Sequence, residues 1–159
     1  MTTAVFPGSF DPITLGHVDI VLRAKTVFDK VIVAVAHNSS KTPLLSVDTR
    51  VELAAKATAH IDGVEVVATE GLIAEFCAEA GAQVLVKGLR SGADFDAEHS
   101  MALMNRSLTG VETFFVTGDS ALQHIASSLV RDVARHGGSI KHLVPPDVEP
   151  AVVEALRAS

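Results

Sequence analysis

The stretch TAVFPGSFDPITLGHVDIVLRAKTVFDKVIVAVA, residues 3–36, contains two short apolar runs separated by a helical pattern. The runs Thr3–Phe6 and Val31–Ala36 are apolar almost throughout, which is typical of strands buried on both faces. Between them, apolar residues recur at helical spacing over Leu15–Phe28. This order predicts two parallel strands joined by a crossover helix, because parallel strands need a long connection.

The same alternation continues along the rest of the chain. Further strands are predicted over Val64–Ala68, Gln83–Val86 and Thr113–Val116. Further helices are predicted over Val47–His60 with Ser46 as N-cap and over Leu72–Ala80 ended by Gly81. The last three are predicted over Ala93–Leu108, from Ser127 or Ser128 to Gly137, and over about 150–158. No long linker or repeat interrupts them. The pattern therefore predicts an α/β fold, a doubly wound five-stranded parallel sheet in a single domain spanning residues 1–159.

Composition limits the class of protein and its partners. The chain has 159 residues, 48% of them apolar and 20% charged, which suits one globular domain. The net charge of −6 argues against nucleic acid or an anionic membrane as a partner, since both need a basic face. The single Cys77 cannot form an internal disulfide and is expected to be buried and inert. With no basic leader at the N-terminus, we expect a cytoplasmic protein.

Residues that suit anion binding follow each predicted strand. In doubly wound sheets, ligands bind beyond the carboxyl ends of the strands. The residues at those positions are Gly8-Ser9-Phe10, Asn38-Ser39-Ser40-Lys41, Gly71-Leu72, Lys87-Gly88-Leu89-Arg90 and Thr117-Gly118-Asp119, followed by Ser127-Ser128. Glycine lets backbone N–H groups approach phosphate, and Lys and Arg supply charge. The sequence predicts a site for a ligand with several phosphates.

Each of these residues also has an ordinary explanation. Gly8, Pro12 and Gly16 could simply shape a turn, His17 could be a helix-end histidine, and lysines and arginines are mostly solvated. Their convergence at one edge favours the functional interpretation. P-loop, dinucleotide-binding, hydrolase, zincin and C-x-x-C motifs are absent from the sequence.

Four motifs carry a resemblance to a known family. Thr14–His17, TLGH, resembles the (T/H)-x-G-H signature of the nucleotidyltransferase superfamily. The longer PGSFDPITLGHVDI, with VKGLR at Val86–Arg90, MNR at Met104–Arg106 and IASSLVRDVARHGG at Ile125–Gly138, closely resembles the bacterial phosphopantetheine adenylyltransferase family. The resemblance runs from Ala4 to about Pro145.

The resemblance implies a fold, a reaction and partners. The fold would be Rossmann-like, of the nucleotidyltransferase type, and the assembly a homohexamer. The reaction would transfer AMP from ATP to 4′-phosphopantetheine, giving dephospho-coenzyme A and pyrophosphate, with Mg²⁺ assisting and coenzyme A as feedback inhibitor. The attacking phosphate oxygen is already ionised at neutral pH, so this chemistry needs no general base.

The resemblance also implies roles for individual residues. His17, with Lys41 and Arg90, would act in catalysis, His17 by contacting the ATP phosphates and stabilising the transition state. The acceptor would be bound by Ser9, Lys41, Leu72, Ile73, Lys87 and Asn105. ATP would be bound by Ser9, Phe10, His17, Gly88, Leu89, Arg90, Glu98, Leu122, Gln123, His124, Ile125, Ala126, Ser127 and Ser128.

The sequence departs from the family pattern at a few positions. Lys87 stands where many members carry Arg, so a bidentate fork is lost while the charge is kept. Ala126 replaces the first serine of a serine triplet. Ala97 occupies a commonly aromatic position, and Asp119–His124 lacks aromatic residues, which puts the packing of adenine in question.

Other functions remain as alternatives. A nicotinamide-mononucleotide adenylyltransferase or a cytidylyltransferase would share T-x-G-H but not the combination of Lys41, K-G-L-R and A-S-S-L-V-R. An aminoacyl-tRNA synthetase fragment would need a K-M-S-K-S loop. A nucleotide-binding regulatory module or a flavodoxin-like carrier would perform no chemistry, and such a binder has less use for a histidine at the reacting phosphate.

Overall fold

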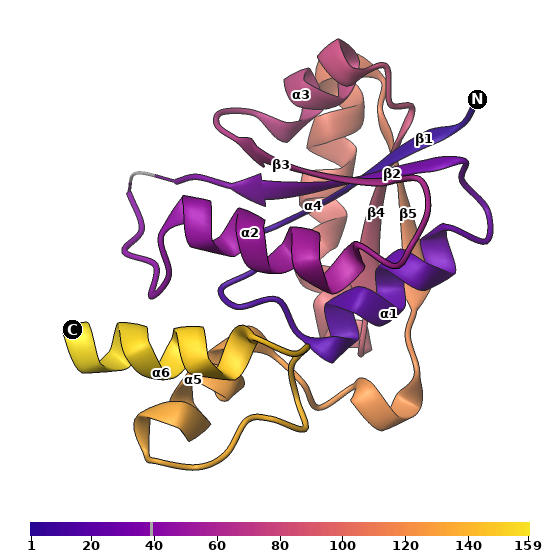
Figure 1. The fold of residues 1–159 in the computed structure, drawn as a ribbon. Coiled ribbons are helices and arrows are strands. Elements are labelled where there is room, and N and C mark those ends of the chain that lie inside the picture. Colours follow the sequence, from indigo (N-terminus) through magenta and orange to yellow (C-terminus); the bar gives the residue numbers. More distant parts are fainter. Residues whose placement is uncertain (39) are drawn as a thin grey trace.

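The centre of the molecule is a parallel sheet with the strand order β3-β2-β1-β4-β5 (Figure 1). The computed structural model describes residues 1–38 and 40–159, so Ser39 of the predicted anion-binding edge lies outside the described residues. The strands are β1 (Thr3–Gly8), β2 (Lys30–Ala36), β3 (Val64–Thr69), β4 (Val84–Leu89) and β5 (Glu112–Thr117). All five predicted strands are confirmed, and so is the α/β class.

Helices cover both faces of the sheet. They are α1 (Leu15–Ala24), α2 (Val47–Thr58), α3 (Ile73–Ala80), α4 (Gly92–Thr109), α5 (Ser127–Arg135) and α6 (Val148–Ala158), with a 3₁₀ helix η1 at Ser120–Leu122. One apolar cluster joins α1, α2, α5 and α6 to one face, and a second joins α3 to the other. Figure 1 shows α5 and α6 together at one end of the molecule, beneath the carboxyl ends of the strands.

Alternation along the central strands produces these two clusters. Val31, Val33 and Val35 of β2 are buried in the larger cluster, whereas Ile32 and Ala34 are buried in the smaller one. Successive side chains of a strand point to opposite faces. A continuous apolar run therefore needs helices on both sides, which is why the runs predicted a doubly wound sheet.

Some helix ends differ from the prediction. Helix α1 ends at Ala24 instead of Phe28, because residues 25–27 form a turn in which the Thr26 hydroxyl donates to the Arg23 carbonyl at 2.6 Å. Helix α6 begins at Val148 and so includes Pro150 in its first turn, where a missing N–H costs no intrahelical bond. The short helix η1 was not predicted. Ser46 as the N-cap of α2 and Gly81 as the end of α3 are confirmed, and Gly81 has the left-handed conformation.

The sheet opens between β1 and β4. Strands β1 and β2 pair along their whole length, but β1 and β4 pair only at Ala4↔Val84 and Val5↔Leu85. Lys30 donates to the Thr2 carbonyl, so even-numbered residues of β1 bond to β2 and odd-numbered ones face β4. Pro7 is odd-numbered and has no N–H with which to continue the ladder. The strands diverge there, at the point where the strand order reverses, which is where such folds bind ligands.

Cys77 is buried on α3, as predicted, and burial raises the pKa of its thiol to about 11. Among the described residues, no helix is long and apolar enough to cross a membrane.

Candidate active site

A cavity of about 360 Å³ occupies the gap between β1 and β4. This volume is in the range usual for small-molecule sites. The lining residues come from the ends of β1, β4 and β5, from α1, α4, η1 and the start of α5: Phe6, Pro7, Thr14, Gly16, His17, Asp19, Ile20, Lys87, Gly88, Leu89, Arg90, Glu98, Gly118, Asp119, Leu122, Gln123, Ile125, Ala126, Ser127 and Ser128. We call it the first cavity.

His17 is held by a reciprocal cap at the start of α1. The Thr14 hydroxyl accepts the backbone N–H of His17 at 3.3 Å, and Nδ1 of His17 accepts the backbone N–H of Thr14 at 3.0 Å. This is the capping-box arrangement with histidine in the position usually taken by Glu or Gln. Because Nδ1 accepts, the neutral ring carries its proton on Nε2. Thr14-x-Gly16-His17 thus both starts the helix and sets the tautomer.

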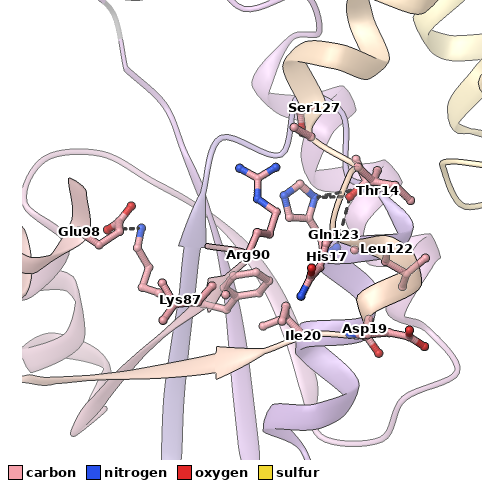
Figure 2. A pocket seen from close by; sticks show the side chains of 18 of the residues that line it. Thr14, His17, Asp19, Ile20, Lys87, Arg90, Glu98, Leu122, Gln123 and Ser127 are labelled. Carbon is pink, nitrogen blue, oxygen red and sulfur yellow. Dashed lines mark hydrogen bonds and ion pairs between the residues drawn. The ribbon is translucent and has the colours of Figure 1, made fainter. Parts of the chain in front are cut away.

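The surroundings of His17 keep its ring uncharged. Burial, and secondarily the positive charge of Arg90, lower the pKa of His17 from 6.5 to about 4. Its ring packs edge-on against Phe10, with the ring centroids 4.9 Å apart. Figure 2 shows the ring between Thr14 and the guanidinium of Arg90. At neutral pH, His17 is therefore a fixed, uncharged hydrogen-bond donor.

Phe10 supports this site from the core. It has φ = 49°, an uncommon value for a bulky residue, and its side chain is buried against Phe6 and His17. A Cβ at Gly8 would come within 3.1 Å of the Phe10 ring, so any larger residue there would require the ring to shift. Phe10 was predicted to bind the nucleotide, but its side chain does not line the cavity, so only its backbone is available to a ligand.

Two cations line the cavity from β4 and the loop after it. Lys87 forms an ion pair with Glu98 of α4 at 3.3 Å, and Figure 2 shows this pair on the side of the cavity opposite η1. Arg90 lies 3.4 Å from Asp94, and its side chain is 47% exposed. Neither pair is deeply buried, so both cations can exchange a carboxylate for a phosphate at little cost.

The start of α5 faces the same cavity without a side-chain cap. Its N-cap is Ala126, which cannot accept a hydrogen bond from the first turn. The Ser127 hydroxyl donates to the Pro12 carbonyl at 2.8 Å, and Ser128 is exposed. The departure from the serine triplet therefore removes a hydroxyl and leaves the N–H groups of this turn uncapped. Such a helix start is an anion-binding position.

A second cavity of about 510 Å³ lies on the other side of Pro7, which lines both cavities. We call it the second cavity. The ends of β2 and β3 form it, and its lining residues are Pro7, Ala36, His37, Asn38, Thr69, Glu70, Gly71 and Ile73. Leu72, the N-cap of α3, is exposed beside Ile73. Lys41 is exposed in the turn that follows β2, where its N–H donates to the Asn38 carbonyl.

The structure brings most of the predicted ATP-binding residues together. The predicted ATP-binding residues that line the first cavity are His17, Gly88, Leu89, Arg90, Glu98, Leu122, Gln123, Ile125, Ala126, Ser127 and Ser128. Of the residues predicted to bind the acceptor, Lys87 lines the first cavity and Ile73 lines the second. Ser9, Phe10, Lys41, Leu72, Asn105 and His124 line neither. Of these, Phe10 and Asn105 are buried, and the other four are exposed.

Asp19 is a lining residue that the sequence did not single out. Its carboxylate accepts the N–H of Asp119 at 2.8 Å and the Nε of Arg23 at 3.0 Å, so it ties α1 to the loop after β5. Asp19 follows Gly16 by three residues, which places both on one side of α1. That spacing is the signal by which it could have been found.

The described residues contain no group of three or more His, Cys, Asp or Glu side chains that could hold a metal ion. The carboxylates that line the first cavity are Asp19, Glu98 and Asp119. This donor set suits Mg²⁺ that stays bound to phosphates and water, because that ion often takes only one or two protein carboxylates.

Comparison with known proteins agrees with the geometry. The cytidylyltransferase-like family matches residues 5–133. The chain is 49% identical over 158 residues to the phosphopantetheine adenylyltransferase of Bifidobacterium longum, covering 98% of this chain and 95% of that protein. It is 46% identical over 157 residues to the enzyme of the same name from Streptomyces coelicolor, covering 99% of each.

Among solved structures, the fold is similar to one named as a nicotinate-nucleotide adenylyltransferase from Vibrio parahaemolyticus. The TM-score is 0.73 at 16% identity, with 100% of this chain and 98% of that chain covered. At that identity the likeness concerns the fold alone. The two sequence matches, by contrast, have 46% and 49% identity over nearly the whole chain. The chain therefore belongs to the phosphopantetheine adenylyltransferases within the cytidylyltransferase-like family.

Proposed function

We propose that this protein transfers the adenylyl group of ATP to 4′-phosphopantetheine, giving dephospho-coenzyme A and pyrophosphate. The observation that carries the proposal is a pair of cavities that meet at Pro7, one of them lined by an uncharged His17, two cations and an uncapped helix start. The names of the relatives indicate the acceptor, and the two adjoining cavities support a separate binding place for each substrate.

ATP would occupy the first cavity. Its phosphates would lie among Arg90, the Nε2–H of His17 and the N–H groups at the start of α5. Its base would lie toward η1 and Ile20, in the part of the cavity that Leu122 and Gln123 close. Ile20, Leu122 and Ile125 would offer adenine aliphatic surface, and Phe6 also lines the cavity.

The acceptor would extend from Pro7 into the second cavity. Ile73 and Leu72 offer apolar surface to the pantetheine arm. Lys87 and Lys41 would approach its phosphate from opposite sides, one from β4 and the other from the turn after β2. Asn105 is buried in α4 and lines neither cavity, so it would act on the acceptor only through neighbouring residues.

The reaction requires in-line placement of the two substrates and compensation of the negative charge on the transferred and leaving phosphates. A phosphate oxygen of the acceptor attacks the α-phosphorus of ATP, the new P–O bond forms in line with the bond to the β-phosphate, and pyrophosphate leaves. The attacking oxygen is already anionic, so no proton has to be removed. Donors that are fixed before the reaction stabilise the charge on the transferred group, and His17 is such a donor. Mg²⁺ would arrive with ATP and supply further positive charge to its phosphates.

Assembly, regulation and location are further parts of the proposal. Helix α4 exposes Phe95, Met101, Leu103, Met104 and Leu108, a surface that favours self-association, and we place it in a homohexamer. Coenzyme A combines a nucleotide with a pantetheine arm, so it would compete for both cavities as a feedback inhibitor. The protein would act in the cytoplasm.

Pyrophosphate release tests the reaction directly. Purified protein with ATP, Mg²⁺ and 4′-phosphopantetheine should form pyrophosphate and dephospho-coenzyme A in equal amounts. Parallel reactions with CTP in place of ATP, and with nicotinate mononucleotide in place of the acceptor, should give at most a hundredth of that rate. If only a parallel reaction is active, another nucleotidyl transfer replaces the proposal, and if ATP binds without turnover, the chain is a binding module.

A further inference from the structure

Arg50 of α2 is a buried cation whose hydrogen bonds end on the backbone at the edge of the site. Only 2% of its surface is exposed. Its Nε donates to the carbonyl of Leu45 at 3.1 Å, and one terminal nitrogen donates to the carbonyls of Ser9 at 2.8 Å and Ala36 at 2.9 Å. A buried guanidinium is costly unless hydrogen bonds compensate its charge. Its presence here therefore points to a requirement for holding these carbonyl groups.

Two of the three carbonyls lie at the boundary between the cavities. Ser9 is the first residue after β1, and Ala36 is the last residue of β2 and lines the second cavity. Pro7, two residues before Ser9, lines both cavities. Arg50 thus joins the carboxyl ends of two neighbouring strands at the place where the proposed substrates meet.

Holding the Ser9 carbonyl also fixes the direction of a backbone donor. The carbonyl of Ser9 and the N–H of Phe10 belong to one planar peptide group and point in opposite directions. No described residue accepts a hydrogen bond from the Phe10 N–H. This donor is therefore unpaired among the described residues, and its direction depends on Arg50.

Asp11 completes the connection from the other side. Its two carboxylate oxygens accept the N–H groups of Leu44 and Leu45, each at 2.9 Å. Arg50 donates a hydrogen bond to the carbonyl of the same Leu45. The segment that leads from Lys41 into α2 is therefore fixed to the loop after β1 through both its N–H and its carbonyl groups.

We propose that Arg50 is a positioning residue for adenylyl transfer. It holds the Ser9–Phe10 peptide and the end of β2 in register, so that the acceptor phosphate stays in line with the α-phosphorus of ATP. In-line attack is sensitive to displacements of about 1 Å. This role rests on the proposed function, and it belongs to a residue that touches neither substrate.

The test compares two variants of Arg50 with a control on the same helix. Arg50→Lys keeps the charge but lacks the fork that reaches three carbonyls, and Arg50→Met removes the charge. Leu53→Ala removes a buried side chain of α2 that forms no hydrogen bond to the site, so it lowers stability without moving Ser9. Circular dichroism defines a temperature at which each variant is folded, and kcat, KM for both substrates and the Kd for ATP alone are measured there.

We expect both Arg50 variants to lose at least tenfold in kcat while the Kd for ATP changes less than threefold. Leu53→Ala should keep kcat within twofold. The proposal is overturned if Arg50→Lys keeps kcat within threefold of the original chain, if it does not fold, or if Leu53→Ala loses as much. If Arg50→Met alone fails to fold, the lysine variant decides. Pyrophosphate formation by the unaltered chain is scored first, so a failure of the proposed function is seen separately.

Discussion

The two cavities meet at Pro7 but are built in different ways. The first contains one group that is already fixed, His17: Thr14 is 1% exposed, and the backbone and ring of His17 are both bonded to it. In the second, Nε2 of His37 lies 3.4 Å from a carboxylate oxygen of Glu70, with side chains 42% and 75% exposed, and Lys41 lies on an exposed turn. An exposed side chain loses freedom when a ligand orders it, which costs about 0.5–1.5 kcal/mol each. His17 of the first cavity is preorganised, whereas the polar side chains of the second would have to be ordered by a ligand.

Removing the fixed donor of the first cavity should have the largest effect on rate. We expect His17→Ala to lower turnover by at least about 100-fold, near 3 kcal/mol, which is typical for one preorganised donor. The measurement is kcat from pyrophosphate release, with folding checked by circular dichroism. His60→Ala, an exposed histidine in the turn after α2, is the matched control and should be unaffected. Near-normal turnover of a folded His17→Ala protein would show that the preorganised donor of the first cavity does not contribute to the reaction.

Low pH should weaken the folded state through the same residue. The pKa of His17 is about 4 in the folded protein and 6.5 as the ordinary value, so between these pH values the unfolded chain binds more protons. The free energy of unfolding should therefore be highest above pH 6.5 and fall as the pH drops toward 4, by at most about 3 kcal/mol from this group.

Urea unfolding at several pH values measures this loss. His17→Gln is the comparison, because Gln at this position keeps the capping acceptor but does not titrate. The stability difference between the two proteins should change across pH 4–6.5 and be constant above it. A constant difference across the whole range would show that the ring is not held uncharged.

Space in the first cavity can be tested at Gly16. A Cβ there would approach only ordinary contacts within the protein, the nearest being the Thr14 hydroxyl at 3.5 Å. We expect Gly16→Ala to fold normally and to weaken ATP binding by roughly tenfold, about 1.4 kcal/mol, because the methyl group enters space that the nucleotide needs. Calorimetric titration with ATP measures the loss. Gly92→Ala, where an added Cβ meets nothing within 4 Å, should bind ATP unchanged.

Removing Lys41 should have the smallest effect on activity and should distinguish the acceptor site from the ATP site. We expect Lys41→Ala to raise the KM for 4′-phosphopantetheine about three- to tenfold, up to about 1.4 kcal/mol, and to leave the Kd for ATP unchanged. The reason is that an exposed cation gains only part of its attraction for a phosphate against water and salt. Lys56→Ala, an exposed lysine of α2, is the control. A loss of ATP binding in Lys41→Ala would show that this turn serves the first cavity as well.

Much of the first cavity could be predicted from sequence because its parts are local patterns. Thr14-Leu15-Gly16-His17 directly after a strand, Lys87-Gly88-Leu89-Arg90 at the end of another, and Ser127-Ser128 at a helix start each occupy a short stretch. The rule that ligands bind beyond the carboxyl ends of strands then brings them together. The second cavity was predicted less well, because its family residues include exposed groups such as Ser9, Lys41 and Leu72 that line no cavity by themselves.

The sequence by itself determined the order of strands and helices, the α/β class and the signature that begins α1, because apolar periodicity and capping act between residues close along the chain. Tertiary structure alone decided the low pKa of His17, the withdrawal of Phe10 into the core and the burial of Arg50. These depend on partners far apart in sequence: Arg50 meets Ser9 across 41 positions, and Asp19 meets Asp119 across 100. Burial and partnership at such separations exist only once the sheet has brought the strand ends together.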